Sequence, residues 1–394
     1  MLSIAEARAL VEQALTPLGT ERVRVADALG RVLAEDVRAA HDVPPFANSA
    51  MDGYAVRAGP AGRTLTVIGD SRAGAPAAEA VDERTAIRIS TGAMVPEGAD
   101  GVLQVELVEL EGDRVTLRAE VSPGLNVRAP GEDMTAGATV VRRGTRLGPA
   151  ELGVAATAGL AELAVGRPPR VAIVATGDEL VPAGAPLGPG QIHDSNAIAL
   201  AAQATNAGAH VLGTARAPDT REGTERALEQ AIGEADVTII SGGVSVGPHD
   251  HVKPALETLG VQERFWRVAL RPGKPTWFGT RGERLVFGLP GNPVSALVTF
   301  HLFARPALLA LQGAPFAAPA TRAVLATPVP RNPGRDEAVR VRLALGRDGR
   351  LEATPTGPQG SHQLTSMLGA DGLAVVTAGE GEAPAGEIVD VEAL

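Results

Sequence analysis

The sequence of 394 residues contains no cysteine, one tyrosine, two tryptophans and only two lysines among its 36 basic residues. The lack of cysteine excludes disulfides, iron–sulfur clusters and thiolate zinc sites. It also fits a reducing compartment, so we expect the protein in the cytoplasm. The scarcity of lysine means that arginine carries nearly all of the positive charge.

The sequence also lacks an uninterrupted apolar run and a basic stripe. The longest apolar stretch, Val294 to Leu311, contains a histidine, an arginine and a proline, which argues against a membrane span. The chain opens with Ser3-Ile-Ala-Glu6, a capping-box pattern that predicts a helix, and no basic and apolar leader precedes it, so we expect no signal peptide. The formal net charge of −10 argues against nucleic-acid binding, so an anionic ligand would need local cations.

The length and the changing pattern of apolar residues predict a multidomain protein. Residues 41–131 contain short β-type runs between Gly/Pro turns, which is typical of a small all-β domain. We expect this domain to be inserted into a split N-terminal α+β domain formed by residues 1–40 and 132–166. Residues 315–394 return to β-type alternation and predict a C-terminal β-barrel-like domain.

Residues 167–314 show a different pattern of apolar residues. Apolar strands such as RVAIVAT and DVTII alternate with helical stretches. This alternation predicts a doubly wound parallel-sheet domain, so the fold class is multidomain α/β plus β. In open α/β sheets, ligands bind beyond the carboxyl ends of the strands, and we therefore expect the binding residues to lie there.

Three glycine-containing loops follow predicted strands of this domain, at the same expected sheet edge. Glycine-rich turns that open onto helix N-termini bind phosphate and other oxyanions. In the third loop, Asn292 is a predicted N-cap and Pro293 suits the first helical turn, so free N–H groups face the loop. The candidate binding residues of the three loops are Thr176, Gly177 and Asp178, then Ser241, Gly242, Gly243 and Ser245, then Pro290, Asn292 and Pro293.

Both lysines lie close to these loops, Lys253 after SGGVSVGPHDHV and Lys274 in RPGKP. A compact ammonium group is not interchangeable with a planar guanidinium at a tight anion site. Lys274, three residues after Arg271, is therefore predicted to face an anion. Lys253 fits the pattern of an ordinary surface lysine better.

Carboxylates near the same loops predict a magnesium site. Glu179 and Asp250 lie in or just after two of the loops, and hard oxygen ligands of this kind suit Mg²⁺ bridging phosphate oxygens. Asp219 is open to two interpretations, a metal ligand or a turn former. Asp194 is predicted to cap a helix. The histidines on either side of Asp250 suggest a transition metal only weakly, because adjacent residues on a helix do not face each other.

Several segments together resemble the molybdopterin molybdenumtransferase family, which includes the molybdenum-insertion domain of gephyrin. The segments are PPFANSAMDGYAVR, STGAMVPEGAD, NVRAPGEDM, ATGDEL, GQIHDSN, IISGGVSVG, RPGKP, GLPGNPVSA and QGSH. They occur in this order along nearly the whole chain.

The resemblance implies a four-domain homodimer whose active site lies between the sheet domain of one subunit and the N-terminal domains of the other. The implied reaction uses molybdate, adenylylated molybdopterin and a divalent cation. The phosphoanhydride is hydrolysed, AMP leaves, and molybdenum enters the dithiolene. Molybdopterin adenylyltransferase and downstream molybdoenzymes or chaperones are the expected partners.

The resemblance also implies roles for individual residues. Asp52 and Asp133, unremarkable by themselves, become catalytic carboxylates that reach the neighbouring subunit's site. Glu179 and Asp250 become catalytic ligands on the metal or nucleotide side. The residues implied to hold molybdate are Arg271, Lys274 and Ser295, together with Arg340, Ser361 and Ser366 of the C-terminal domain.

Two other functions stay open. Adenylyl transfer onto the pterin uses a similar sheet domain and SGG loop, but it would leave residues 1–165 and 315–394 without a role. An interaction scaffold, as gephyrin also is, is disfavoured by the complete set of carboxylates and by the absence of a long linker.

Overall fold

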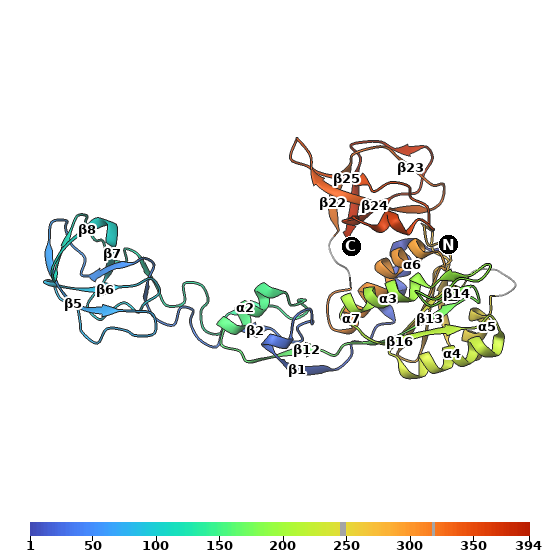
Figure 1. The fold of residues 1–394 in the computed structure, drawn as a ribbon, viewed down its shortest axis with the longest axis horizontal. Helices are drawn as coiled ribbons and strands as arrows, with labels where there is room; N and C mark the ends of the chain where they lie inside the picture. The colour runs from blue at the N-terminus through green and yellow to red at the C-terminus, as the bar shows by residue number, and fades with distance from the viewer. Residues whose placement is uncertain (245–249, 317–319) are drawn as a thin grey trace. The chain divides into compact units, whose positions relative to one another are not determined.

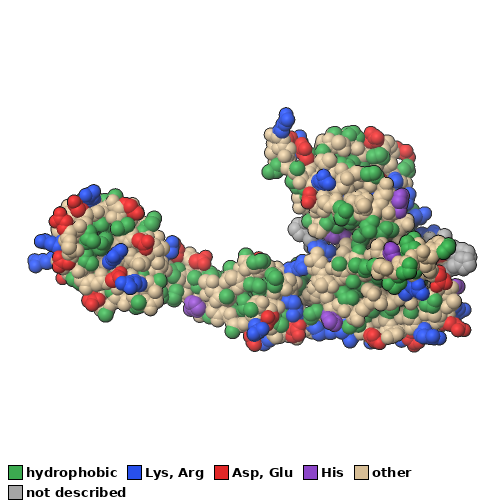
Figure 2. Space-filling model, in the orientation of Figure 1, with side chains coloured by type: hydrophobic (Ala, Val, Ile, Leu, Met, Phe, Trp, Pro, Cys, Tyr) green, Lys and Arg blue, Asp and Glu red, His purple; other side chains and the backbone are tan. Residues whose placement is uncertain are grey.

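The computed structural model describes residues 1–244, 250–316 and 320–394. The chain forms two compact units (Figure 1). The large unit consists of Met1–Glu21, Gly30–Ala34 and Ala164–Leu394, and the small unit consists of Arg22–Leu29 and Glu35–Leu163. Figure 2 shows acidic and basic side chains interspersed on the visible surface of each unit.

A six-stranded sheet in the order β16-β13-β17-β21-β20-β18 forms the centre of the large unit. The parallel strands are β16 (His210–Ala217), β13 (Arg170–Thr176), β17 (Val237–Ser241) and β21 (Arg284–Leu289). At one edge, β20 (Trp277–Arg281) and β18 (Gln262–Trp266) run antiparallel to their neighbours. The predicted parallel sheet is thus confirmed, with an antiparallel edge added to it.

Helices cover both faces of this sheet, as a doubly wound fold requires (Figure 1). On one face, α3 (Ser195–Asn206) shares a hydrophobic core with the long helix Pro293–Leu311. On the other face, α4 (Arg221–Glu234) packs with α5 (Val252–Thr258). The strands supply both cores because successive side chains point to opposite faces: Ile239 belongs to the first core and Ile240 to the second.

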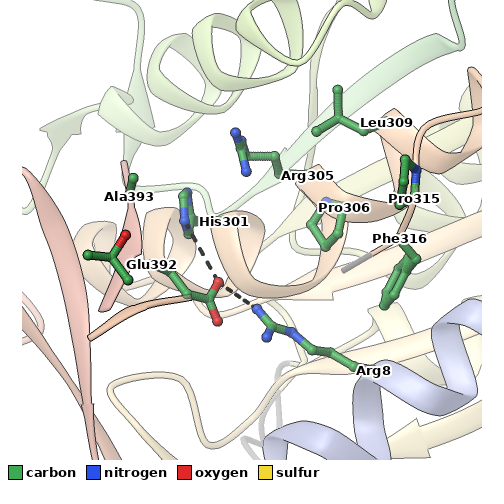
Figure 3. Close-up of a pocket in the computed structure, with 10 residues that line it drawn as sticks. Arg8, His301, Arg305, Pro306, Leu309, Pro315, Phe316, Glu392 and Ala393 are labelled. Atoms are coloured by element: carbon green, nitrogen blue, oxygen red, sulfur yellow. Dashed lines mark hydrogen bonds and ion pairs between the residues drawn. The ribbon is translucent and has the colours of Figure 1, made fainter. Parts of the chain in front are cut away.

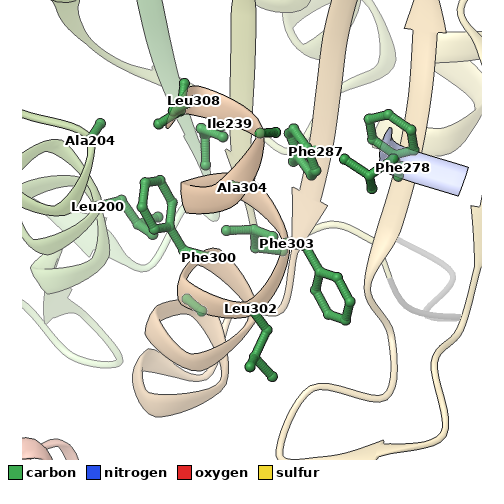
Figure 4. Packing of buried hydrophobic residues seen from close by; sticks show 14 of the residues in the cluster. Leu200, Ala204, Ile239, Phe278, Phe287, Phe300, Leu302, Phe303, Ala304 and Leu308 are labelled. Carbon is green, nitrogen blue, oxygen red and sulfur yellow. The ribbon is translucent and has the colours of Figure 1, made fainter. Parts of the chain in front are cut away.

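The long helix is the centre of the larger core. It comprises α6 (Pro293–Thr299), the π-helical segment η3 (Phe300–Ala304) and α7 (Arg305–Leu311). By length and composition it could cross a membrane, but 83% of its apolar window is buried inside the structure. Figure 4 shows Phe300 and Phe303 packed among side chains from the sheet and α3. This burial agrees with the sequence argument against a membrane span.

The first helix, α1 (Ile4–Gln13), begins with the predicted capping box. The Glu6 N–H donates to Ser3 Oγ at 3.2 Å, and the Ser3 N–H donates to Glu6 Oε2 at 2.8 Å. We expected this helix in a split N-terminal domain. Instead, its buried Ile4, Ala7 and Val11 join the larger core of the large unit, because that core covers its apolar face. The other domain boundaries stay predictions.

The small unit contains a six-stranded sheet in the order β7-β4-β6-β5-β9-β8, built around Tyr54, Leu65 and Val115. Its strands are β4 (Gly53–Val56), β5 (Thr64–Ser71), β6 (Thr85–Ile89), β7 (Gly101–Gln104), β8 (Val108–Glu111) and β9 (Arg114–Leu117). Flanking segments return to each other where β2 (Val37–Arg38) pairs with β11 (Thr139–Val141), beside α2 (Pro149–Thr157). Shorter pairs are β3 (Asn48–Ser49) with β10 (Val127–Arg128), and β1 (Thr20–Arg24) with β12 (Glu162–Gly166).

The C-terminal part of the large unit is a closed barrel of five strands, which confirms the predicted barrel-like domain. The strands are β22 (Thr321–Leu325), β24 (Asp336–Leu345), β25 (Leu351–Pro355), β26 (Gly372–Val376) and β28 (Ile388–Ala393). Alternating small and branched side chains such as Ala323, Val339 and Ala374 fill its interior. Strand β19 (Leu270–Arg271) pairs parallel with β24 and so attaches the RPGKP segment to the barrel.

Candidate functional site

The structure brings the three predicted loops together at one sheet edge. Strands β13, β17 and β21 are parallel neighbours, and their ends are in register: Ala175 lies opposite Ser241, which lies opposite Leu289. The Gly242 N–H donates to the Leu289 carbonyl at 3.0 Å. The loops that follow these strands are therefore adjacent.

The second loop requires its glycines. Gly242 and Gly243 have positive φ values of 89° and 66°. A Cβ on Gly242 would lie 2.7 Å from Thr176 Oγ1, and one on Gly243 would lie 2.4 Å from a methyl carbon of Val252. The backbone of this loop thus approaches the first loop more closely than any side chain allows. Ser245, also predicted here, lies outside the described residues.

Asn196 ties the second and third loops together. Its Nδ2 donates to Ser241 Oγ at 2.9 Å and to the Gly291 carbonyl at 2.8 Å. Sequence reasoning missed this residue, although it lies in GQIHDSN, one of the segments that carry the family resemblance. Asp194 caps α3 as predicted, accepting from the Ala197 N–H at 3.0 Å. The predicted cap places Asn196 in the first turn of the helix, next to the loops, and this position could have identified it from the sequence.

In the first loop, Asp178 and Asp219 bond reciprocally. The Asp178 N–H donates to Asp219 Oδ2 at 3.0 Å, and the Asp219 N–H donates to Asp178 Oδ1 at 3.4 Å. Asp219 therefore joins the loop after β13 to the loop before α4. The Glu179 carboxylate lies over Gly177, where a Cβ would come within 2.4 Å of Glu179 Oε2.

The residues expected to bind a metal are not grouped around a common point. In the part of the chain that the structure describes, no three His, Asp or Glu side chains are placed to hold a metal ion. Glu179 is exposed, and Asp219 and Asp250 are half-buried. Their role as magnesium ligands therefore stays a prediction.

A pocket of about 390 Å³ lies where the RPGKP segment, the start of α6 and the barrel meet, and we call it the Arg271–Lys274 pocket. It combines positive side chains with hydroxyl and amide groups, which suits an oxyanion. Its lining includes the predicted residues Arg271, Lys274, Pro290, Asn292, Ser295 and Ser361, together with Arg335, Gln359, Gly360 and His362, which sequence reasoning missed.

Asn292 takes the predicted N-cap position of α6 but uses its side chain differently. Among the described residues it makes no capping hydrogen bond; its Nδ2 instead donates to Ser361 Oγ at 3.0 Å. The Val294 N–H donates to the Ser361 carbonyl at 3.1 Å. The start of the helix is thus attached to a barrel loop, and Ser361 is held at the pocket wall.

Arg340 and Ser366 lie behind that wall. The Arg340 side chain is fully buried, and its Nη2 donates to Ser366 Oγ at 3.0 Å and to the Gly360 carbonyl at 3.4 Å. Gln359 contacts the backbone of the same arginine, and its Oε1 accepts from the Arg340 N–H at 2.9 Å. These contacts support the loop that carries Ser361.

The two lysines have different surroundings. Lys274 lines the Arg271–Lys274 pocket, whereas the Lys253 Nζ stacks 3.0 Å from the centre of the Trp266 ring. The Arg267 guanidinium stacks on the same ring at 3.9 Å. Lys253 thus packs against an aromatic side chain by a cation–π contact.

In the small unit, Asp52 is exposed and held by Thr91. It accepts from the Thr91 N–H at 2.7 Å and from Thr91 Oγ1 at 3.0 Å. These hydrogen bonds, the backbone bond foremost, hold the pKa of the Asp52 carboxyl below its usual range. Thr91 was missed at the sequence level, although it lies in STGAMVPEGAD. Asp133 is also exposed, and its N–H donates to the Val43 carbonyl at 2.9 Å.

A second pocket, of about 150 Å³, lies between α1, the long helix and β28 (Figure 3). Arg8 crosses it, donating from Nη2 to Glu392 Oε2 at 2.7 Å and from Nε to the Leu302 carbonyl at 2.9 Å. The buried His301 lies 4.0 Å from the same carboxylate. Burial, and to a lesser extent Arg305, lowers the pKa of His301 to about 4.

Replacing His301 with glutamine should weaken the pH dependence of stability. Between the ordinary pKa of 6.5 and the folded value of about 4, the unfolded chain binds a proton that the folded chain excludes. The stability due to neutral His301 is therefore present above pH 6.5 and is lost as the pH falls toward 4. From about pH 7 to about pH 5, the wild type should lose roughly 2 kcal/mol more than the variant in urea unfolding. His210→Gln, at an exposed strand position, is the control; identical behaviour of the two variants would contradict the prediction.

Models of known families match three parts of the chain. Residues 2–159 match the MoeA N-terminal region (domain I and II), residues 172–310 a probable molybdopterin binding domain, and residues 322–394 the MoeA C-terminal region (domain IV). Together these matches extend over nearly the whole sequence.

Individual proteins are similar over the same length. A molybdopterin molybdenumtransferase of Haemophilus influenzae is 38% identical, with coverage of 100% of this chain and 98% of that protein. Molybdopterin molybdenumtransferase 2 of Mycobacterium tuberculosis is 39% identical, with coverage of 95% of both. The crystal structure of a molybdopterin biosynthesis moeA protein from Pyrococcus horikoshii has a TM-score of 0.82, 30% identity and full coverage of both chains.

Proposed function

The chain belongs to the molybdopterin molybdenumtransferase family, transferases of molybdenum cofactor biosynthesis, and on this premise we propose that it inserts molybdenum from molybdate into adenylylated molybdopterin. The observation that carries the proposal is the Arg271–Lys274 pocket, next to the sheet edge where the glycine loops meet. The pocket suits a small dianion, and the glycine loops at the sheet edge suit a diphosphate.

Molybdate is a tetrahedral dianion, and the pocket offers the groups that hold such an ion. Arg271 and Lys274 supply positive charge in a chain whose formal net charge is −10. Ser361 supplies a hydroxyl that Asn292 holds in place. In our proposal, Arg340 and Ser366 act through the loop at Gly360 and Ser361 rather than on the anion directly.

The glycine loops are the proposed seat of the phosphoanhydride. Gly242 and Gly243 let the loop backbone lie against Thr176 and Val252, and glycine-rich turns of this kind at a sheet edge bind phosphate oxygens through peptide N–H groups. In the proposed hydrolysis, water attacks the phosphorus of the pterin's phosphate and loses a proton to solvent, the bond from that phosphorus to the bridging oxygen breaks, and AMP departs with that oxygen and the electron pair. Because AMP is a good leaving group, positioning and charge neutralisation supply most of the catalysis.

The proposed reaction also uses a divalent cation, which we expect to be magnesium and which would neutralise charge on the phosphate oxygens. In the described part of the chain, Glu179, Asp219 and Asp250 do not assemble a cation site by themselves. We propose that Asp52 and Asp133 of the second subunit of a homodimer complete the set of carboxylates. Molybdopterin adenylyltransferase as the supplier and molybdoenzymes or chaperones as the recipients are further proposed partners.

Incubation of the purified protein with adenylylated molybdopterin, molybdate and magnesium tests the function. We expect AMP release that depends on molybdate, and molybdenum in the recovered pterin. ATP consumption with unmodified molybdopterin, in place of AMP release, would assign the chain to adenylyl transfer instead. If neither reaction occurs, an interaction scaffold becomes the better description.

A further inference from the structure

Glu337, a buried acid beside the Arg271–Lys274 pocket, has no role in the function described so far. We propose that Glu337 is an internal counter-ion that competes with the bound oxyanion for Arg271 and so sets the affinity of the pocket. The inference rests on the proposed function, since it takes molybdate as the ligand of that pocket.

Strand pairing places the two residues side by side. Strand β19 runs parallel to β24, with Arg271 opposite Glu337. The Arg271 Nη1 lies 3.7 Å from Glu337 Oε2. The glutamate side chain is 7% exposed, whereas that of the arginine is 47% exposed. The acid is therefore buried beside the pocket, and the more exposed guanidinium has the freedom to turn toward an anion.

Arginines surround this carboxylate. Burial raises the pKa of Glu337, while Arg271, Arg340 and Arg335 oppose that rise. Arg335 lines the pocket, and Arg340 is fully buried behind it. Together with Lys274, this cluster holds more positive than negative charge. Without Glu337, the surplus of positive charge facing the pocket would be larger.

The geometry favours a role through charge over a role in fixing the arginine. In the part of the chain that the structure describes, the buried Glu337 Oε2 accepts no hydrogen bond. A carboxylate that orients a guanidinium normally forms two short, parallel hydrogen bonds. In the same domain, Arg331 Nη2 donates to both carboxylate oxygens of Glu387, at 2.6 and 2.7 Å, whereas Arg271 Nη1 stays 3.7 Å from Glu337 Oε2.

The requirements of catalysis explain why an acid beside the pocket would be useful. Binding that is equally strong in the ground state and the transition state lowers KM without raising kcat. Three cations lining the pocket, Arg271, Lys274 and Arg335, would hold a dianion tightly before the reaction begins, and they would hold sulfate or phosphate in the same way. A competing carboxylate weakens the resting complex, so molybdate exchanges and leaves the pocket for the pterin.

The test is the affinity of the pocket for molybdate alone, measured by equilibrium dialysis of the full chain. Glu337→Gln removes the charge at nearly constant shape, and it should bind molybdate and sulfate about tenfold more tightly than the wild type, because both the competition and the repulsion are lost. In turnover, KM for molybdate should fall while kcat does not rise. Unchanged or weaker binding would overturn the inference, since loss of a merely structural contact weakens the pocket.

Matched variants complete the experiment. Glu337→Asp keeps the negative charge and should bind molybdate with nearly the wild-type affinity. Glu387→Gln removes an acid that pairs with an arginine outside the pocket, and its affinity for molybdate should also be that of the wild type. If Glu337→Gln does not fold, the single variant Arg271→Gln is compared with the double variant Arg271→Gln/Glu337→Gln. The double variant loses one positive and one negative charge and so keeps the net charge of the wild type. The double variant should bind molybdate more tightly than the single one, and the opposite order would overturn the inference. A wild type that binds no molybdate would instead overturn the proposed function.

Discussion

Asp52→Asn is expected to reduce molybdenum insertion by about 100-fold or more in kcat, with the fold of the small unit retained. The Asp52 carboxylate is held ionised by two hydrogen bonds from Thr91, and asparagine of the same shape keeps an oxygen for the Thr91 N–H. The substitution therefore removes the charge and little else. AMP release and pterin-bound molybdenum are the measurements, with circular dichroism to check the fold.

Asp82→Asn is a close control for this variant. Asp82 is exposed in the same unit and accepts from the Arg84 N–H and from Thr85 Oγ1, both at 2.8 Å. The same two kinds of bond lower its pKa, but it lies outside the short motifs on which the family resemblance depends. Wild-type activity is expected for Asp82→Asn. Equal activity of the two variants would remove Asp52 from the catalytic set.

Lys274→Ala is expected to raise KM for molybdate by roughly 100-fold. A hydrogen bond to a charged group contributes about 1.5–3 kcal/mol, and each 1.4 kcal/mol corresponds to about tenfold in affinity. Lys274 is exposed in the pocket wall, so its removal should leave the stability of the large unit nearly unchanged. Steady-state AMP release at varied molybdate concentration gives the result.

Lys253→Ala removes the only other lysine in the chain. Its Nζ stacks on Trp266, so we expect a loss of roughly 0.5–1 kcal/mol in stability and an unchanged KM for molybdate. A similar rise in KM for both lysine variants would mean that the anion is not bound at Lys274.

The two active-site variants together test the proposed homodimer. If Asp52 of one subunit serves the Lys274 pocket of the other, a mixed dimer of Asp52→Asn and Lys274→Ala has one intact and one doubly altered site. At a molybdate concentration near the wild-type KM, unfolding and refolding an equal mixture should then restore about a quarter of wild-type activity, because half of the dimers are mixed and each of these has one intact site of two. Activity no higher than that of the separate variants would contradict a site shared between subunits.

Much of the fold was predictable from local patterns. The helix caps at Ser3 and Asp194, and the N-cap position at Asn292, follow from side-chain chemistry within a few residues. The strand-and-helix alternation of residues 167–314 predicted the sheet, and the register of its strands put the glycine loops at one edge. These features depend on backbone propensity and the period of apolar residues, which a sequence displays directly.

Long-range packing decided the rest. The amphipathic pattern of α1 predicted a helix but not which core would bury Ile4, Ala7 and Val11. Resemblance to the family pointed to Arg340 as a residue that holds the anion, and the structure places it behind the wall because its guanidinium finds Ser366 and the Gly360 carbonyl there. No local signal distinguishes a buried arginine from an exposed one.

The sequence by itself determined the family, the order of the elements and the residue types that can bind an oxyanion, because these are carried by short motifs and by periodicity. Only the tertiary structure decided that Arg271, Asn292 and Ser361 share one pocket, and that Glu337 lies beside it. These residues come together through the pairing of β19 with β24 and the bond between Asn292 and Ser361. Such contacts join distant parts of the chain, and their energy depends on the packing of the whole unit.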